Sequence, residues 1–173
     1  MRHHMTLLGA SLLAGLIAIV VNTLILEAAD WIPLVTARGG LLKLLKIYFS
    51  EPLMRAGVAD LWASLHLTSP DSGAFKSGFH IVVGLLMAVF YAFALEPVLP
   101  GSPLIKGLIY ALLVWLANAF IVLPWIGEGI AGSRYLSAAG MLYFAVAHTV
   151  FFVGLAMLYP YFVKSPRRNP APA

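Results

Sequence analysis

Two histidines and two asparagines stand out because each interrupts a long apolar stretch: His80, His148, Asn22 and Asn118. A polar or ionisable side chain is costly to bury in a membrane, so each is a candidate functional group if its stretch crosses one. Imidazole is the usual axial ligand of a b-type haem. The cofactor candidates at His80 and His148 are therefore haem b, a quinone or a pigment, set against a structural role for each histidine.

The expected depths of the two histidines argue against a single haem held by both. His80 lies within a turn of the start of its apolar stretch, 79–99, whereas His148 lies about eleven residues into the stretch 137–163. At about 1.5 Å per residue, this places them roughly 12–14 Å apart along the membrane normal. A structural role is favoured, and no bound cofactor is expected.

Other chemistry has little support in the sequence. It contains no His-Glu-x-x-His pattern, no Gly-x-Ser-x-Gly elbow and no cysteine, so the usual signatures of zinc hydrolysis, of a serine nucleophile and of thiolate metal sites are missing. We therefore expect neither an enzyme nor a metal site.

The elements that must position these residues are four apolar stretches, roughly 5–27, 79–99, 104–126 and 137–163. Each is long enough to cross the ~30 Å hydrocarbon core of a bilayer as a helix. The chain is 61% hydrophobic with a mean hydropathy of +0.92, and its seven acids fall at span ends or between spans. The sequence predicts an all-α integral membrane four-helix bundle, one membrane domain over residues 1–173, arranged as two antiparallel hairpins.

Small residues recur every four positions in the first two spans, which places them on one helix face and allows close helix packing in lipid. The stripes are Ala10, Ala14, Ala18 and Asn22 in the first span, and His80, Gly84, Ala88 and Ala92 in the second. We expect these stripes to face each other and Asn22 to hydrogen-bond His80.

The last two spans show a looser version of this pattern, with Gly107, Ala111 and Asn118 on one helix and His148 on the next. A second Asn–His pair at one depth is expected, and two such hairpins are consistent with a parallel duplication. Chance pairing of four polar residues is the alternative. Aromatic residues within the spans are expected to face lipid, or else to line a groove for an isoprenoid tail or carotenoid: Phe90, Tyr91, Phe93, Trp115, Phe120, Tyr143, Phe144, Phe151 and Phe152.

The loop over residues 30–77 is predicted to carry two short amphipathic helices, over 41–49 and from Pro52 to Leu65. These helices either lie at the headgroup level or dock another subunit. Basic residues in the C-terminal tail, Lys164, Arg167 and Arg168, favour cytoplasmic termini, although five basic residues in the long loop oppose that assignment.

Short glycine-based motifs give the chain a resemblance to uncharacterised bacterial four-helix inner-membrane proteins. They are Gly78-Phe79-His80 with Gly84, Lys106-Gly107 with Trp115, Leu123-Pro124 followed by Gly127 and Gly129, and Ala147-His148 with Gly154. The resemblance implies architecture and a bacterial inner-membrane location, and no mechanism.

The function expected from the sequence is that of a non-catalytic accessory subunit of a larger membrane complex, respiratory or photosynthetic, with lipids and other subunits as partners. The rivals are a b-haem- or quinone-binding electron carrier and a small transporter or assembly factor. Nucleic acid is not an expected partner, because the basic residues are scattered among loops.

Overall fold

The computed structural model describes residues 2–32, 34–36, 40–66 and 68–163. Over these residues the secondary structure is helical, with no strand. Four stretches are long and apolar enough to cross a membrane: Thr6–Trp31, Gly73–Leu95, Pro103–Trp125 and Ala138–Phe162. The protein is therefore a multi-pass membrane protein built as an all-α four-helix bundle, as the sequence predicts.

The spans are built from several helical segments. The first is α1 (Arg2–Ala28) with the 3₁₀ turn η1 (Ala29–Trp31), and the second is α4 (Gly73–Phe90) with the π turn η2 (Tyr91–Leu95). The third joins α5 (Pro103–Ala117), the π turn η3 (Asn118–Val122) and α6 (Leu123–Trp125), and the fourth is α7 (Ala138–Phe162), preceded by the 3₁₀ turn η4 (Ile130–Gly132). Between the first two spans lie α2 (Gly40–Arg55) and α3 (Val58–Ser64). We call α2 and α3 together the arm.

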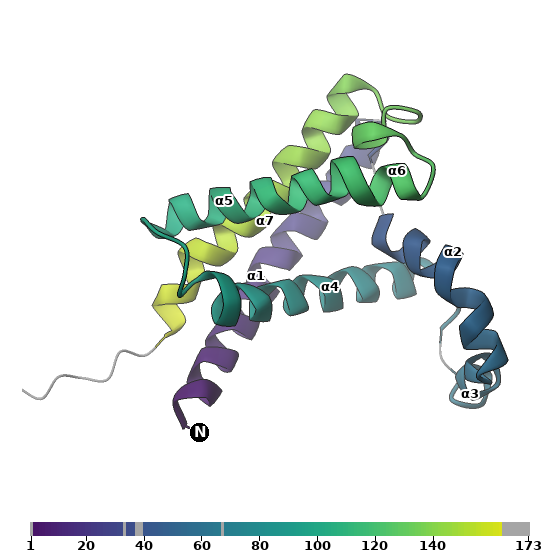
Figure 1. Ribbon diagram of the computed structural model, residues 1–173, viewed down its shortest axis with the longest axis horizontal. Helices are drawn as coiled ribbons and strands as arrows, with labels where there is room; N and C mark the ends of the chain where they lie inside the picture. The colour runs from purple at the N-terminus through teal and green to yellow at the C-terminus, as the bar shows by residue number, and fades with distance from the viewer. Residues whose placement is uncertain (1, 33, 37–39, 67, 164–173) are drawn as a thin grey trace, which may run out of the picture.

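Helices α1 and α7 form the centre of the bundle. α7 packs against both α1 and α5, and α1 packs against α4. In Figure 1, α1 and α7 run obliquely together, and α4 and α5 cross them. The arm lies at the end of the bundle that is opposite the N-terminus. α4 and α5 meet around Tyr110, whose hydroxyl donates to the Met87 carbonyl at 3.2 Å.

The close approach of neighbouring helices explains why small residues occupy the contact positions. A Cβ on Gly107 would lie 2.8 Å from Val153 Cα, and one on Gly84 would lie 2.5 Å from Ile19 Cγ1. All eight predicted packing residues are buried: Ala10, Ala14, Ala18, Gly84, Ala88, Ala92, Gly107 and Ala111. In lipid, where helices gain little from hydrophobic burial, such close contact supplies much of the association energy.

The second span begins six residues earlier than predicted. Ser72 caps α4 by accepting a hydrogen bond from the Phe75 amide at 3.1 Å, so the helix starts at Gly73 instead of residue 79. This places His80 well inside the helix. At its other end, the second span finishes with the π-helical turn at Leu95, before Pro97.

Several span aromatics point inward, contrary to the expectation that they face lipid. Tyr91 is 1% exposed, and Phe144, Phe151 and Phe152 are also buried. Tyr91 stacks on Tyr110 with ring centroids 6.0 Å apart, and Tyr110 lies 4.4 Å from Phe152. Aromatic rings here fill the space that the small residues leave between the helices.

The first arm helix is longer than predicted. α2 continues through Pro52 to Arg55, and the break comes at Gly57, which adopts the left-handed conformation with φ 72° that ends helices. The residues expected to form two helices therefore divide at Gly57 and not at Ser50. Four of the basic residues used to judge orientation lie outside the described residues: Arg38 in the long loop, and Lys164, Arg167 and Arg168 in the tail.

Candidate functional site

The four polar residues singled out from the sequence lie at nearly one depth. Counted at about 1.5 Å per residue from the middle of each span, Asn22, His80, Asn118 and His148 are about 3–6 Å from mid-span. All four are displaced toward the membrane surface that carries the arm. We call these four residues the polar belt.

Asn22 connects three of the four spans. Its Oδ1 accepts a hydrogen bond from His80 Nε2 at 2.9 Å, and its Nδ2 donates to the Ala147 carbonyl at 2.8 Å. The side chain is 1% exposed. One amide therefore ties α1 to α4 and to α7, and the carbonyl of Ala147 fixes which end of the amide faces His80.

These bonds overturn the expected separation of the two histidines. His80 and the Ala147 carbonyl both contact the same amide, and His148 follows Ala147 directly. The depth predicted from the sequence is wrong because α4 starts at Gly73, which puts His80 about four residues from mid-span. The two histidines differ by only about 3 Å in depth.

The expected Asn118–His148 bond is not formed. Asn118 Nδ2 donates to the Val114 carbonyl at 3.2 Å, and His148 Nδ1 donates to the Phe144 carbonyl at 2.9 Å. Each side chain thus bonds to the carbonyl four residues earlier in its own helix, an arrangement that competes with bonds between helices. The second hairpin does not repeat the polar pair of the first.

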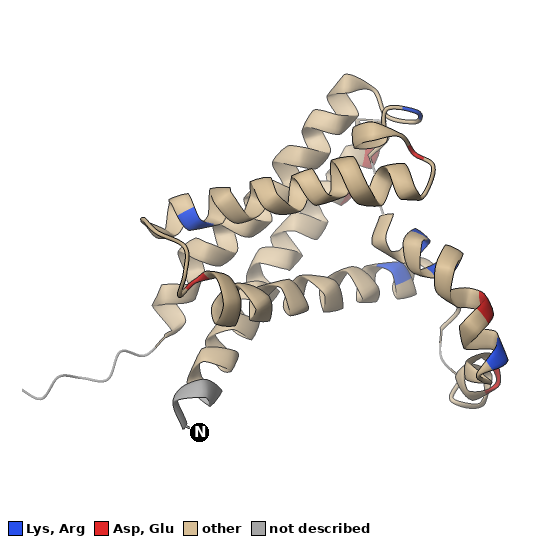
Figure 2. Cartoon of the chain, viewed as in Figure 1, with Lys and Arg blue, Asp and Glu red and all other residues tan. Residues whose placement is uncertain are grey.

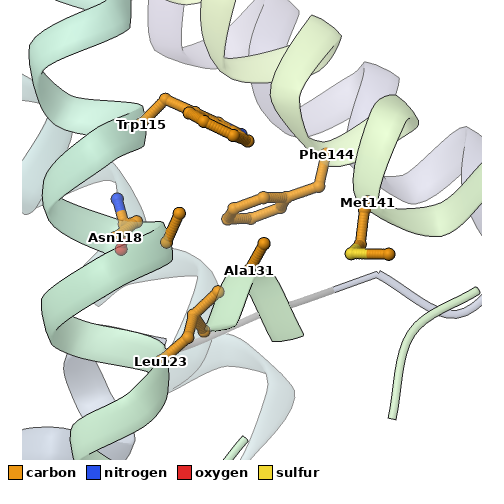
Figure 3. Close-up of a pocket in the computed structure, with 7 residues that line it drawn as sticks. Trp115, Asn118, Leu123, Ala131, Met141 and Phe144 are labelled. Carbon is orange, nitrogen blue, oxygen red and sulfur yellow. The ribbon is translucent and has the colours of Figure 1, made fainter. Parts of the chain in front are cut away.

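A small void lies beside Asn118, between η3 and α7 (Figure 3). Its volume of about 10 Å³ has room for about one water molecule. Its lining is largely apolar: Trp115, Asn118, Ala119, Leu123, Ala131, Met141 and Phe144. The void is too small for a haem or a quinone ring.

Charged residues gather at the two ends of the bundle and on the loops, and leave the middle of the spans free of charge in Figure 2. On the arm side, Lys43 pairs with Glu128 and Lys46 pairs with Asp71, each at 2.5 Å. At the other end, Lys106 donates to Glu96 Oε1 at 2.9 Å. Lys46 holds the pKa of Asp71 below its ordinary value, by its hydrogen bond first and its charge second.

The two Lys pairs on the arm side attach α2 to the ends of two different spans. Gly40 lies against Leu123, and Tyr48 packs on Trp125 with ring centroids 6.1 Å apart. Lys46 also donates to the Pro70 carbonyl at 3.1 Å, just before α4. The sequence showed the lysines three residues apart on α2 but gave no sign of their acidic partners, which are 85 and 25 residues away.

Sequence reasoning also missed two tyrosines that bridge helices. Tyr143 donates to the Ile25 carbonyl at 2.5 Å, joining α7 to α1, and Tyr110 joins α5 to α4. A hydroxyl that must find a partner in lipid is the signal that could have identified Tyr143 within its apolar span. Among the residues that the structure describes, no three His, Cys, Asp or Glu side chains come together as a metal site would require.

Comparison of the chain with protein-family models, with curated proteins and with solved structures gives no match. The case for a function therefore rests on the geometry of this chain.

Proposed function

We propose that the protein is a non-catalytic accessory subunit of a larger membrane complex, and that its arm docks onto another subunit. Respiratory or photosynthetic electron-transfer complexes of the bacterial inner membrane are the class of assembly we have in mind. In this proposal both chain termini lie in the cytoplasm, and the arm lies on the opposite membrane surface.

The observation that carries the proposal is that α2 exposes apolar side chains on two sides. Ile47 is 56% exposed and Phe49 is 51% exposed. Residues two apart on a helix point to nearly opposite faces. A helix lying at the membrane surface can cover one apolar face with hydrocarbon, which leaves the other for a partner protein.

The rest of the arm extends this surface. Further strongly exposed apolar residues are Leu53, Met54 and Leu61 on the arm and Leu65 directly after α3, at 47–61% exposure. The two ion pairs and the Tyr48–Trp125 contact hold α2 in place on the bundle. A surface that is both apolar and held in one orientation suits docking, because less ordering entropy is lost on binding.

Site-specific photocrosslinking in native membranes tests this proposal. A photoreactive residue at position 47 or 49 should give a protein adduct from at least one of the two sites. Leu112, which is 56% exposed on α5, is the matched control and should give lipid adducts. Lipid adducts alone from both arm positions would refute the docking proposal.

Gentle purification of the full chain separates the accessory subunit from its rivals. We expect a colourless chain that co-purifies with a larger oxidoreductase. A chain that migrates alone and shows a Soret band would favour the b-haem carrier instead.

A further inference from the structure

An open pocket lies between the start of α5 and the end of α7, which pack against each other. In Figure 1 both of these helix ends lie on the left, at the end of the bundle opposite the arm. The volume of the pocket is about 440 Å³, within the range of roughly 300–1,000 Å³ that is usual for small-ligand sites. Six residues line it, and we call it the tail-side pocket: Ser102, Pro103, Leu104, Met157, Pro160 and Tyr161.

The lining of the tail-side pocket changes from polar to apolar with depth. Ser102 directly precedes the third span and Tyr161 stands one residue before the end of the fourth, so both hydroxyl groups lie at the level of the lipid headgroups. Ser102 does not use its hydroxyl group to cap α5, and Tyr161 is 80% exposed. Met157 lies one helical turn before Tyr161, about 6 Å deeper in the membrane, and Leu104 lies inside the third span. A phospholipid has the same order of polarity, with a polar headgroup above apolar chains.

The charge of the protein is divided unequally between the two membrane surfaces. By position in the sequence, the arm surface carries six basic and six acidic residues, whereas the opposite surface carries five basic residues and one acidic residue. The whole net charge of +4 therefore lies on the surface with the tail-side pocket. Its one acidic residue, Glu96, is already paired with Lys106. Three of its basic residues directly follow the fourth span, as the basic tail: Lys164, Arg167 and Arg168.

We infer that the tail-side pocket binds an anionic phospholipid, with an acyl chain against Leu104 and Met157 and the phosphate group at the level of Ser102 and Tyr161. Each Lys or Arg beside a membrane strengthens the binding of anionic lipid by about fivefold. A zwitterionic lipid carries a cation as well as a phosphate, and the basic tail repels that cation. The inference does not rest on docking by the arm, because the arm lies at the other end of the bundle.

Fluorescence quenching at a single labelled site tests this inference, because the chain has no cysteine of its own. The full-length Met157→Cys variant carries a bimane label in phosphatidylcholine vesicles that contain brominated phosphatidylglycerol or brominated phosphatidylcholine. We expect half-maximal quenching by phosphatidylglycerol at about one fifth of the mole fraction that phosphatidylcholine requires. Leu13→Cys is the matched control, since Leu13 lies in the same half of the bilayer and is 46% exposed against 42% for Met157. At that site the two lipids should quench alike.

Neutralising the basic tail tests the electrostatic cause of the preference. In the Met157→Cys chain, the triple change Lys164→Gln/Arg167→Gln/Arg168→Gln leaves the four spans unaltered and should abolish the preference for phosphatidylglycerol. Arg55→Gln is the control, because Arg55 is an exposed basic residue on the arm, and it should leave the preference unchanged.

Native mass spectrometry of the unlabelled full chain needs no label inside the pocket and so remains decisive if Met157→Cys does not fold. With the two lipids in equal amounts, the chain should retain about fivefold more phosphatidylglycerol than phosphatidylcholine. Equal retention, equal quenching by the two lipids at position 157, the same preference at position 13, or a preference that the triple change does not reduce would overturn the inference. A label at position 157 that neither lipid quenches would likewise overturn it, because protein would then cover the pocket.

Discussion

Asn22 accepts a hydrogen bond from His80 across the contact between α1 and α4, 58 residues apart in the chain. The same amide donates to the Ala147 carbonyl of α7. Asn22 is thus the one member of the polar belt that bonds two other helices. Its position on the small-residue stripe of α1 lets the helices approach closely enough for both bonds.

Replacing Asn22 by Ala should destabilise the bundle by about 1–3 kcal/mol, because the His80 donor and the Ala147 carbonyl lose a buried partner. The free energy of unfolding in mixed micelles with a denaturing detergent measures the effect. Thr23→Val is the control, since Thr23 bonds the Ile19 carbonyl of its own helix and removing its hydroxyl breaks no interhelical bond. Equal losses in the two variants would contradict the linking role of Asn22.

Gly107→Ala should weaken the contact of α5 with α7. A Cβ there would lie 2.8 Å from Val153 Cα and 3.1 Å from Ala156 Cβ, so backbone must move. We expect a loss of about 1–3 kcal/mol, which is typical of overpacking. Gly78→Ala is the matched helical control, because a Cβ at Gly78 meets nothing within 4 Å and alanine has the better helix propensity. Destabilisation by Gly78→Ala as large as that by Gly107→Ala would show that packing at Gly107 is not the cause.

The bundle was predictable because membrane-spanning helices can be recognised from the length and hydropathy of their sequences. The Asn22–His80 bond was predictable for a similar reason, since a polar residue on a packed stripe in lipid must find a partner on the facing helix. The residue at which α4 starts was harder to predict. Residues 69–73 have the composition of a turn, and the capping role of Ser72 moves the helix start by six residues.

The remaining errors concern alternative partners for polar and charged side chains, between which the sequence does not decide. The side chains of Asn118 and His148 could each hydrogen-bond either to the other helix or to the carbonyl four residues earlier in their own helix. The bond within the helix forms in both cases. Their separation in space depends on helix rotation, which a spacing pattern leaves open. The Lys43–Glu128 pair depends on how residues 126–137 fold back toward the arm, and no local pattern encodes that.

Acid should loosen the Lys46–Asp71 contact. Lys46 lowers the pKa of Asp71, so the contact contributes stability above the ordinary carboxyl pKa, and this contribution is lost as pH falls through the lowered value. Titration of the Asp71 carboxyl by ¹³C NMR should give a pKa below that of a free aspartate. In Lys46→Met the pKa should return toward its ordinary value, whereas Arg55→Met, which breaks the Glu51 pair on the same helix, should leave it unchanged. A pKa of Asp71 that does not respond to Lys46→Met would mean that the contact is not formed in solution.

Lys43 and Lys46 should differ in importance although both form 2.5 Å pairs. Glu128 is buried, with a side chain 9% exposed, whereas the Asp71 side chain is 85% exposed. Lys43→Met leaves a buried carboxylate without its cation and should cost about 1–2 kcal/mol, allowing for the half-exposed lysine. Lys46→Met leaves an exposed carboxylate in water and should change the free energy of unfolding little.

The double variant Lys43→Met/Glu128→Gln tests the reason for that difference, because it removes both charges together. If the cost of Lys43→Met is the unpaired carboxylate, the double variant should recover most of the lost stability. Raising the salt concentration should weaken the exposed Lys46–Asp71 pair more than the buried one. A Lys46→Met variant as unstable as Lys43→Met, or a double variant with no recovery, would show that burial of Glu128 does not govern how α2 is held on the bundle.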